Sequence, residues 1–211
     1  MNKRLSTILL CALITTPTMA NDYWNEPNTP SRDNYVGFRL HKNENIVFQY
    51  DLDGAGKDTV RRDNFGFGAV VGNRLSDNIK IEFETLYTGA KRNTSDKKLD
   101  YDIWSNMFNV YLFQEFSGAI APYVGIGIGF SGIWGDINAT TYHISDSTID
   151  LSYQAMIGVN FALNSRIDLN LGFKYQYYGE IEHKLHGTEF AKSTADATEF
   201  YIGAAYKFGI K

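Results

Sequence analysis

The chain has 211 residues, with 44% hydrophobic and 15% aromatic side chains, 19 glycines, 20 basic residues and 24 acidic ones. This size and composition suit a single all-β domain. The formal charge of −4 argues against a nucleic-acid partner, because phosphate binding requires a basic surplus on one face. The single cysteine, Cys11, rules out an intramolecular disulfide framework.

Residues 1–20 have the features of a secretory signal peptide: Lys3 and Arg4 precede an apolar run, and Ala20 suits cleavage. The run is shorter than the roughly 20 residues that a membrane-spanning helix needs. Cys11 lies inside it rather than at the cleavage site, which argues against a lipoprotein. Cleavage would remove two of the 20 basic and none of the 24 acidic residues, giving an exported chain of charge −6 without cysteine.

Residues 21–33 are polar and contain two prolines, which predicts an extended tail. From Asn34 onward, apolar residues recur at every second position, which is typical of β-strands and not of helices. The pattern is clearest in residues 166–180. The predicted strands are residues 34–41 with 46–52 as an extension, 64–75, 79–89, 101–116, 121–133, 148–163, 166–180 and 198–208.

The predicted connections alternate in length along the chain. Three tight polar turns would lie at one end, and four longer polar segments, among them 90–99, 134–147 and 181–197, would lie at the other. An even number of antiparallel strands with this asymmetry is typical of outer-membrane barrels, which have short periplasmic turns and long surface loops. We therefore expect residues 34–211 to form an all-β domain, an eight-stranded antiparallel up-and-down transmembrane β-barrel.

The polar face of the strands combines glycines with charged residues. The glycines are Gly66, Gly68, Gly125, Gly127, Gly129, Gly158, Gly172 and Gly203. A soluble barrel such as a lipocalin would turn its apolar face inward. Here the apolar face is broad and aromatic and would aggregate in water, whereas glycines suit the narrow interior of eight strands. The apolar face should therefore contact lipid.

Charged residues inside such a barrel need partners. We expect Glu82 and Glu84 to form a structural plug with some of the basic residues of the same face, which are Arg39, Lys80, Lys174 and Lys207. Aromatic residues near the strand ends should form the girdles at the membrane interfaces. These are Tyr175, Tyr177 and Tyr178 at one end, and Tyr206 and Phe208 at the other.

The sequence resembles the small eight-stranded outer-membrane β-barrels, a group that includes opacity-type adhesins and alphaproteobacterial surface antigens. The resemblance covers residues 34–208. It rests on residues 67–75, 82–84, 109–111, 122–129 and 205–208. It implies an outer-membrane barrel and indicates little about activity. Such barrels usually end on an aromatic residue, whereas this chain continues past Phe208 for three residues.

Residues 142–146, Tyr-His-Ile-Ser-Asp, followed by Asp150, are the best enzymatic candidate. On an extended chain His143 and Ser145 point the same way, and the segment resembles the His, Ser and acid of lipid A-trimming outer-membrane barrels. A nucleophile needs a base within hydrogen-bond reach and a third group that orients the base. Nothing fixes that geometry in a polar loop, so we interpret the segment as solvated and expect no catalytic residue.

The sequence contains no convincing pattern for a metal-binding site or a phosphate-binding site. His183 and His186 lie among glutamates without a spacing that demands zinc or copper. Gly125, Gly127 and Gly129 match a phosphate-binding loop only superficially, because no helix follows them. We expect no metal ion or cofactor. The basic residues Lys91, Arg92, Lys97 and Lys98 form a solvated patch or contact lipopolysaccharide phosphates.

These features favour a monomeric, non-enzymatic barrel in the outer membrane of a Gram-negative bacterium, surrounded by lipid and lipopolysaccharide. Its exposed loops would contact a host or environmental ligand, and its broader role would be envelope integrity. The alternatives are a lipid A-modifying hydrolase and a weak pore for small solutes. The pore is the weaker of these, since eight strands leave a filled lumen.

Overall fold

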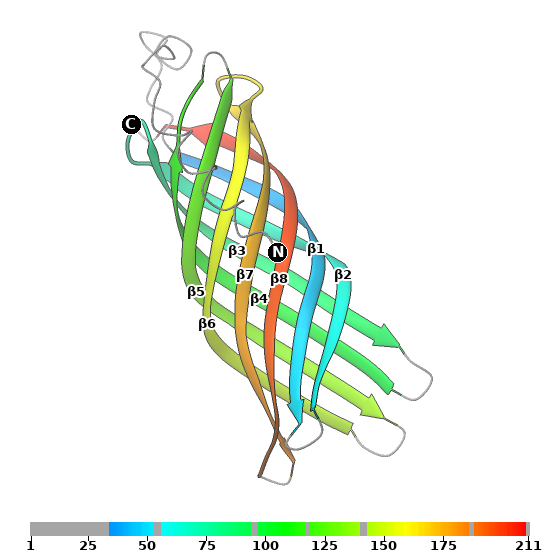
Figure 1. Cartoon of the computed structure of the whole chain (residues 1–211). Coiled ribbons are helices and arrows are strands. Elements are labelled where there is room, and N and C mark those ends of the chain that lie inside the picture. Colours follow the sequence, from blue (N-terminus) through cyan, green and yellow to red (C-terminus); the bar gives the residue numbers. More distant parts are fainter. Residues whose placement is uncertain are drawn as a thin grey trace, which may run out of the picture.

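The computed structural model describes residues 34–52, 56–93, 97–116, 119–139, 143–185 and 188–209. They form eight antiparallel strands that close into a barrel in chain order, with β8 beside β1 (Figure 1). The strands are β1 (Asn34–Leu52), β2 (Gly56–Arg74), β3 (Ile79–Asn93), β4 (Lys97–Phe113), β5 (Ile120–Ala139), β6 (His143–Ala162), β7 (Ile167–Leu185) and β8 (Thr188–Phe208). The predicted all-β, eight-stranded barrel is confirmed. In the described ranges, no helix has the length and hydropathy needed to cross a membrane.

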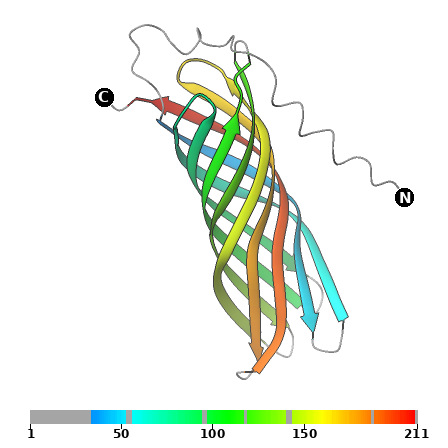
Figure 2. The same cartoon turned by 60° about the vertical axis from the view of Figure 1, so that its left-hand side comes forward.

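The strands are strongly tilted relative to the barrel axis (Figures 1 and 2). Following paired residues once around the barrel from Asn34 leads back to β1 at Glu44, ten residues farther along. For eight strands, this stagger corresponds to a tilt of roughly 35–45°. Closure leaves no sheet edge inside the hydrocarbon, where each unpaired backbone group would cost several kcal/mol.

The two faces of the sheet are arranged as predicted. Ile128 is 58% exposed and points outward, whereas Glu82 is 2% exposed and points into the barrel. Other outward residues form an apolar belt, which includes Phe38, Phe67, Tyr87, Trp104, Phe108, Ile126, Tyr153, Phe173, Tyr175 and Ile202. Because a contiguous apolar surface of this size is unfavourable in water, this belt is the surface that contacts lipid.

The strands are longer than the sequence pattern predicts. Only residues 53–55, 94–96, 140–142 and 186–187 lie between the strands at one end of the barrel. The prediction of long loops at 90–99, 134–147 and 181–197 is therefore wrong for most of their length, because these residues extend the hairpins. Beyond the membrane both faces of a strand can be polar, so the apolar–polar contrast disappears although backbone pairing continues.

The strands have 15 to 21 residues, whereas about 9–11 tilted residues cross a membrane. Each therefore extends well beyond the apolar belt, away from the tight turns that follow β2, β4 and β6. We call this end of the barrel the projecting part. It lies toward the bottom of Figure 1.

The projecting part is divided by two seams. Pairing between β2 and β3 ends at Gly66 and Thr88, and pairing between β6 and β7 ends at Tyr153 and Tyr177. The other six ladders continue to the ends of their hairpins or, between β1 and β8, to Leu52. Among the described residues, the projecting part thus consists of two four-stranded sheets, β7-β8-β1-β2 and β3-β4-β5-β6, whose ends diverge in Figure 1.

Candidate functional site: the charged network inside the barrel

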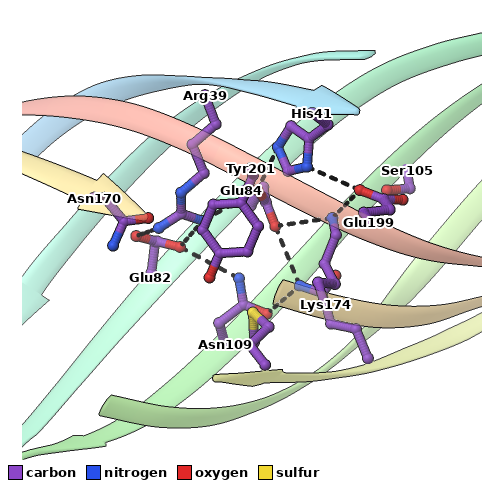
Figure 3. Close-up of polar contacts among 12 residues, drawn as sticks. Arg39, His41, Glu82, Glu84, Ser105, Asn109, Asn170, Lys174, Glu199 and Tyr201 are labelled. Atoms are coloured by element: carbon purple, nitrogen blue, oxygen red, sulfur yellow. Dashed lines mark hydrogen bonds and ion pairs between the residues drawn. The ribbon is translucent and has the colours of Figure 1, made fainter. Parts of the chain in front are cut away.

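A cluster of charged side chains fills the middle of the barrel (Figure 3). It comprises Arg39 and His41 of β1, Glu82 and Glu84 of β3, Lys174 of β7 and Glu199 of β8, each at most 4% exposed. On each strand these residues occupy the inward positions of the two-residue repeat. Strands far apart in the sequence therefore place both signs of charge within the narrow lumen.

Arg39 is the main cation for the two β3 carboxylates. Its guanidinium donates to both oxygens of Glu82, with Nη1–Oε1 and Nη2–Oε2 distances of 2.7 and 2.8 Å. Nη1 also lies 3.1 Å from Oε1 of Glu84, and the guanidinium carbon is 5.1 Å from the centre of the Tyr201 ring. This bidentate geometry is the strong form of a charge-assisted hydrogen bond.

His41 joins carboxylates from strands on either side of its own strand β1. Its Nδ1 lies 2.8 Å from Oε2 of Glu199, and its Nε2 lies 3.4 Å from Oε1 of Glu84. Lys174 Nζ is placed between the same two acids, 3.2 Å from Glu199 and 3.8 Å from Glu84. The Tyr178 hydroxyl donates to the other oxygen of Glu199. The network therefore connects β1, β3, β7 and β8 across the lumen.

The predicted partners of Glu82 and Glu84 are confirmed for Arg39 and Lys174. Lys80 instead directs its ammonium group toward aromatic rings, with its Nζ 4.6 Å from the centre of Tyr111 and 4.9 Å from that of Tyr123. Lys207 pairs with Asp168 at 2.7 Å. These two lysines thus have partners that the alternation alone did not identify.

Sequence reasoning missed three members of the network. His41 and Glu199 both occupy inward positions, but the predicted network included neither of them. Tyr178 was expected in an interfacial girdle, and this is wrong, because its side chain is fully buried inside the barrel. Tyr178 lies four positions after the inward Lys174, so the two-residue repeat places Tyr178 on the inward face as well. The sequence pattern therefore predicts the burial of Tyr178 inside the barrel.

Tyrosines and glycines form a second set of lumenal contacts. In each case the two residues are paired in register on neighbouring strands, and the ring occupies the space that a Cβ atom of the glycine would need. The pairs are Tyr35 with Gly72, Tyr101 with Gly135, Tyr111 with Gly125, Tyr123 with Gly158, and Tyr201 with Gly172. The inward glycines therefore allow large rings to lie against the barrel wall.

The remaining sequence candidates lie in the projecting part. The backbone of His143 and Ser145 belongs to β6, opposite Asn138 and Asp136, and not to a loop as expected. Their side chains, and all of Tyr142, lie outside the described part of the structure.

His183 pairs with Ala191 through the backbone, and His186 falls outside the described ranges. Where the structure is described, no group of three or more His, Cys, Asp or Glu residues is arranged to hold a metal ion. The basic residues expected in a loop are strand residues, Lys91 and Arg92 in β3 and Lys97 and Lys98 in β4; their side chains are not described.

The comparison with protein families decides the assignment. The model of the outer membrane protein β-barrel domain matches residues 6–208. The chain belongs to this family. A family of outer-membrane proteins, a closed barrel and a lipid-contacting belt together place the protein in the outer membrane of a Gram-negative bacterium.

Solved barrels of this kind share the fold. OprG of Pseudomonas aeruginosa matches at a TM-score of 0.65 and 15% identity, covering 84% of this chain and 97% of its own. Neisserial surface protein A (NspA) matches at 0.52 and 19% identity, covering 83% and 97%. Ail of Yersinia pestis matches at 0.52 and 15% identity, covering 83% and 98%. No curated protein matches the sequence.

Proposed function

We propose that this barrel is a non-enzymatic, monomeric surface protein whose projecting part contacts host or environmental ligands and whose barrel supports envelope integrity. The main support for this proposal is the length of the strands. They continue as paired hairpins well beyond the apolar belt, so a rigid β-structure extends outward from the membrane. Rigid scaffolds that present exposed connections are a common basis for binding. Lipid and lipopolysaccharide surround the belt.

The lumen favours this role over that of a pore. Arg39, Glu82, Glu84 and Lys174 are paired and buried across its middle, and tyrosine rings occupy further space along the wall. We therefore expect purified protein in planar bilayers to give conductance at the background level. Steps well above background that persist with the folded, heat-modifiable form would contradict a closed lumen.

The proposed contact function can be tested by shortening two hairpins. Removing residues 91–100 would join Ala90 to Tyr101, and removing 136–145 would join Gly135 to Asp146; both joined pairs are in register. An Asn-Gly turn suits each closure. We expect adhesion of expressing cells to fall severalfold while the barrel keeps its heat-dependent gel mobility. Unchanged adhesion together with unchanged envelope permeability would remove the proposed function.

Point variants separate contact from catalysis in the same assay. We expect H143A and S145A to leave both adhesion and the lipid A profile unchanged, because the proposal assigns neither residue a chemical role. A lipid A profile that changes in these variants, in protein that still folds, would instead support the hydrolase alternative.

A further inference from the structure

Three exposed aromatic side chains lie together on the outer wall of the barrel, across β3, β4 and β5. Trp104 is in register with Tyr87 of β3 on one side and with Gly132 of β5 on the other. Trp134 lies two positions after Gly132 and also points outward. Each of the three aromatic residues is 45–52% exposed, so the rings are accessible to a partner. We call Tyr87, Asp102, Trp104 and Trp134 the aromatic patch.

Hydrogen bonds hold two of these rings in place. The hydroxyl of Tyr87 donates to Oδ1 of Asp102 at 2.7 Å. Nε1 of Trp104 donates to Oγ1 of Thr85, also at 2.7 Å. Both rings are therefore oriented before a partner arrives, which lowers the entropic cost of binding.

The ring of Trp134 covers Gly132, and a carboxylate lies beside it. The Cη2 atom of Trp134 is 2.8 Å from the position that a Cβ atom of Gly132 would take, so the glycine allows the indole to lie against the sheet. Asp102 is in register with Trp134 on β4. A carboxylate can accept several hydrogen bonds, so the bond from Tyr87 leaves Asp102 with further acceptor capacity. An aromatic face beside such an acceptor suits a sugar ring, whose C–H groups contact the ring face and whose hydroxyls donate.

The height of the patch above the tight turns indicates which partner lies beside it. The apolar band begins at the turns, which are flanked by the exposed residues Leu75, Phe116 and Leu163. Nine residues separate Trp104 from Phe113 at the end of β4, and 14 separate Trp134 from Ile120 at the start of β5. At about 2.5 Å of axial rise per tilted residue, these positions lie roughly 23 and 35 Å from the turns. The patch thus lies at and beyond the upper limit of a band about 25 Å tall, where lipopolysaccharide carries its sugars.

We propose that the aromatic patch binds an uncharged sugar ring of lipopolysaccharide in the surrounding outer leaflet. Asp102 disfavours the phosphate groups of this lipid, since like charges repel, whereas sugar hydroxyls can donate to it. The patch continues the lipid-contacting belt, so a saccharide that is attached to a lipid reaches it by lateral diffusion. The inference rests on the proposed lipopolysaccharide surroundings of the barrel and adds one specific contact to them.

The experiment uses the folded mature barrel in phospholipid nanodiscs and the deacylated, dephosphorylated oligosaccharide of lipopolysaccharide as the probe. We expect saturable shifts of the indole Nε1–H resonances of Trp104 and Trp134 in NMR spectra. The variant W134L should bind at least about threefold more weakly, the usual effect of losing one aromatic contact. D102N should reduce the preference for the dephosphorylated over the phosphorylated oligosaccharide, because it removes the charge that repels phosphate. Heat-dependent gel mobility verifies that each variant is folded.

The matched control is Y175L, because Tyr175 is an exposed aromatic residue of the same belt that lies on β7, outside the patch. It should leave the affinity nearly unchanged. The absence of saturable shifts, an equal loss in Y175L, or tighter binding of an unrelated oligosaccharide such as maltoheptaose would each overturn the proposal. The shortened hairpins test the contact function separately, since they retain all four patch residues. Reduced adhesion in them without oligosaccharide binding would leave the contact function standing and remove only this site.

Discussion

The variant R39M is expected to lower the free energy of unfolding by about 3–5 kcal/mol, the usual effect of removing one partner from a buried ion pair. Glu82 would lose both of its 2.7–2.8 Å hydrogen bonds from the guanidinium, and Glu84 would lose one at 3.1 Å. Methionine fills a similar volume, so the effect would come mainly from uncompensated negative charge in the lumen. Urea unfolding in detergent micelles, followed by tryptophan fluorescence and gel mobility, measures the change.

R166M provides the matched control, because Arg166 is exposed in the turn between β6 and β7. Its unfolding free energy should stay within about 0.5 kcal/mol of the original protein. The double variant R39M/E82Q should recover part of the loss, since it removes one of the charges left without a partner. A loss below about 1 kcal/mol for R39M alone would show that the network does not stabilise the barrel.

The variant G125A is expected to destabilise the barrel by about 1–3 kcal/mol, the range for inserting a methyl group into a packed interior. The added Cβ would lie 2.5 Å from Cδ1 of Tyr111 and 3.2 Å from Cε of Met156. Tyr111 cannot retreat freely, because its hydroxyl donates to Glu82 at 2.8 Å. The midpoint of urea unfolding and the fraction of heat-modifiable protein after refolding are the measurements.

Gly132 on the same strand gives the contrasting substitution. It occupies an outward position, and its added Cβ would meet the far end of the Trp134 ring, which is 45% exposed and can move. G132A should therefore have little effect or a slight stabilising one, because alanine restricts the unfolded chain more than glycine. Equal losses in G125A and G132A would indicate a general effect of glycine replacement instead of the tyrosine contact.

Much of the fold could be predicted from the sequence because the membrane imposes the two-residue repeat. Ile126 and Ile128 face lipid while Gly125 and Gly127 face the lumen, so the pattern identifies strand, inward face and fold class together. The prediction of strands depends on this apolar–polar repeat, and this dependence explains why long loops were wrongly predicted. In residues 90–99 and 181–197 the sequence does not alternate between apolar and polar residues, although backbone pairing continues.

The partners inside the lumen could be predicted only in part. Alternation places Arg39, Lys80 and Lys174 on the inward face, but it does not give their heights along the barrel axis. The heights depend on the ten-residue stagger that closes the barrel, which follows from eight ladders at once. Arg39 reaches Glu82 and Glu84 across the lumen from a strand that is not adjacent to theirs, so no local pattern contains this contact.

The tyrosine–glycine pairs also have a consequence for how the chain assembles. The tyrosine–glycine contacts require that two neighbouring strands are aligned correctly. A shift by two positions would place Tyr101 opposite Ile133 or Ile137 instead of Gly135. The β4–β5 hairpin contains two such pairs, at Tyr101 and Tyr111. Both contacts form between strands of the same hairpin and involve no other strand. The alignment of this hairpin is therefore favoured by contacts between its own two strands.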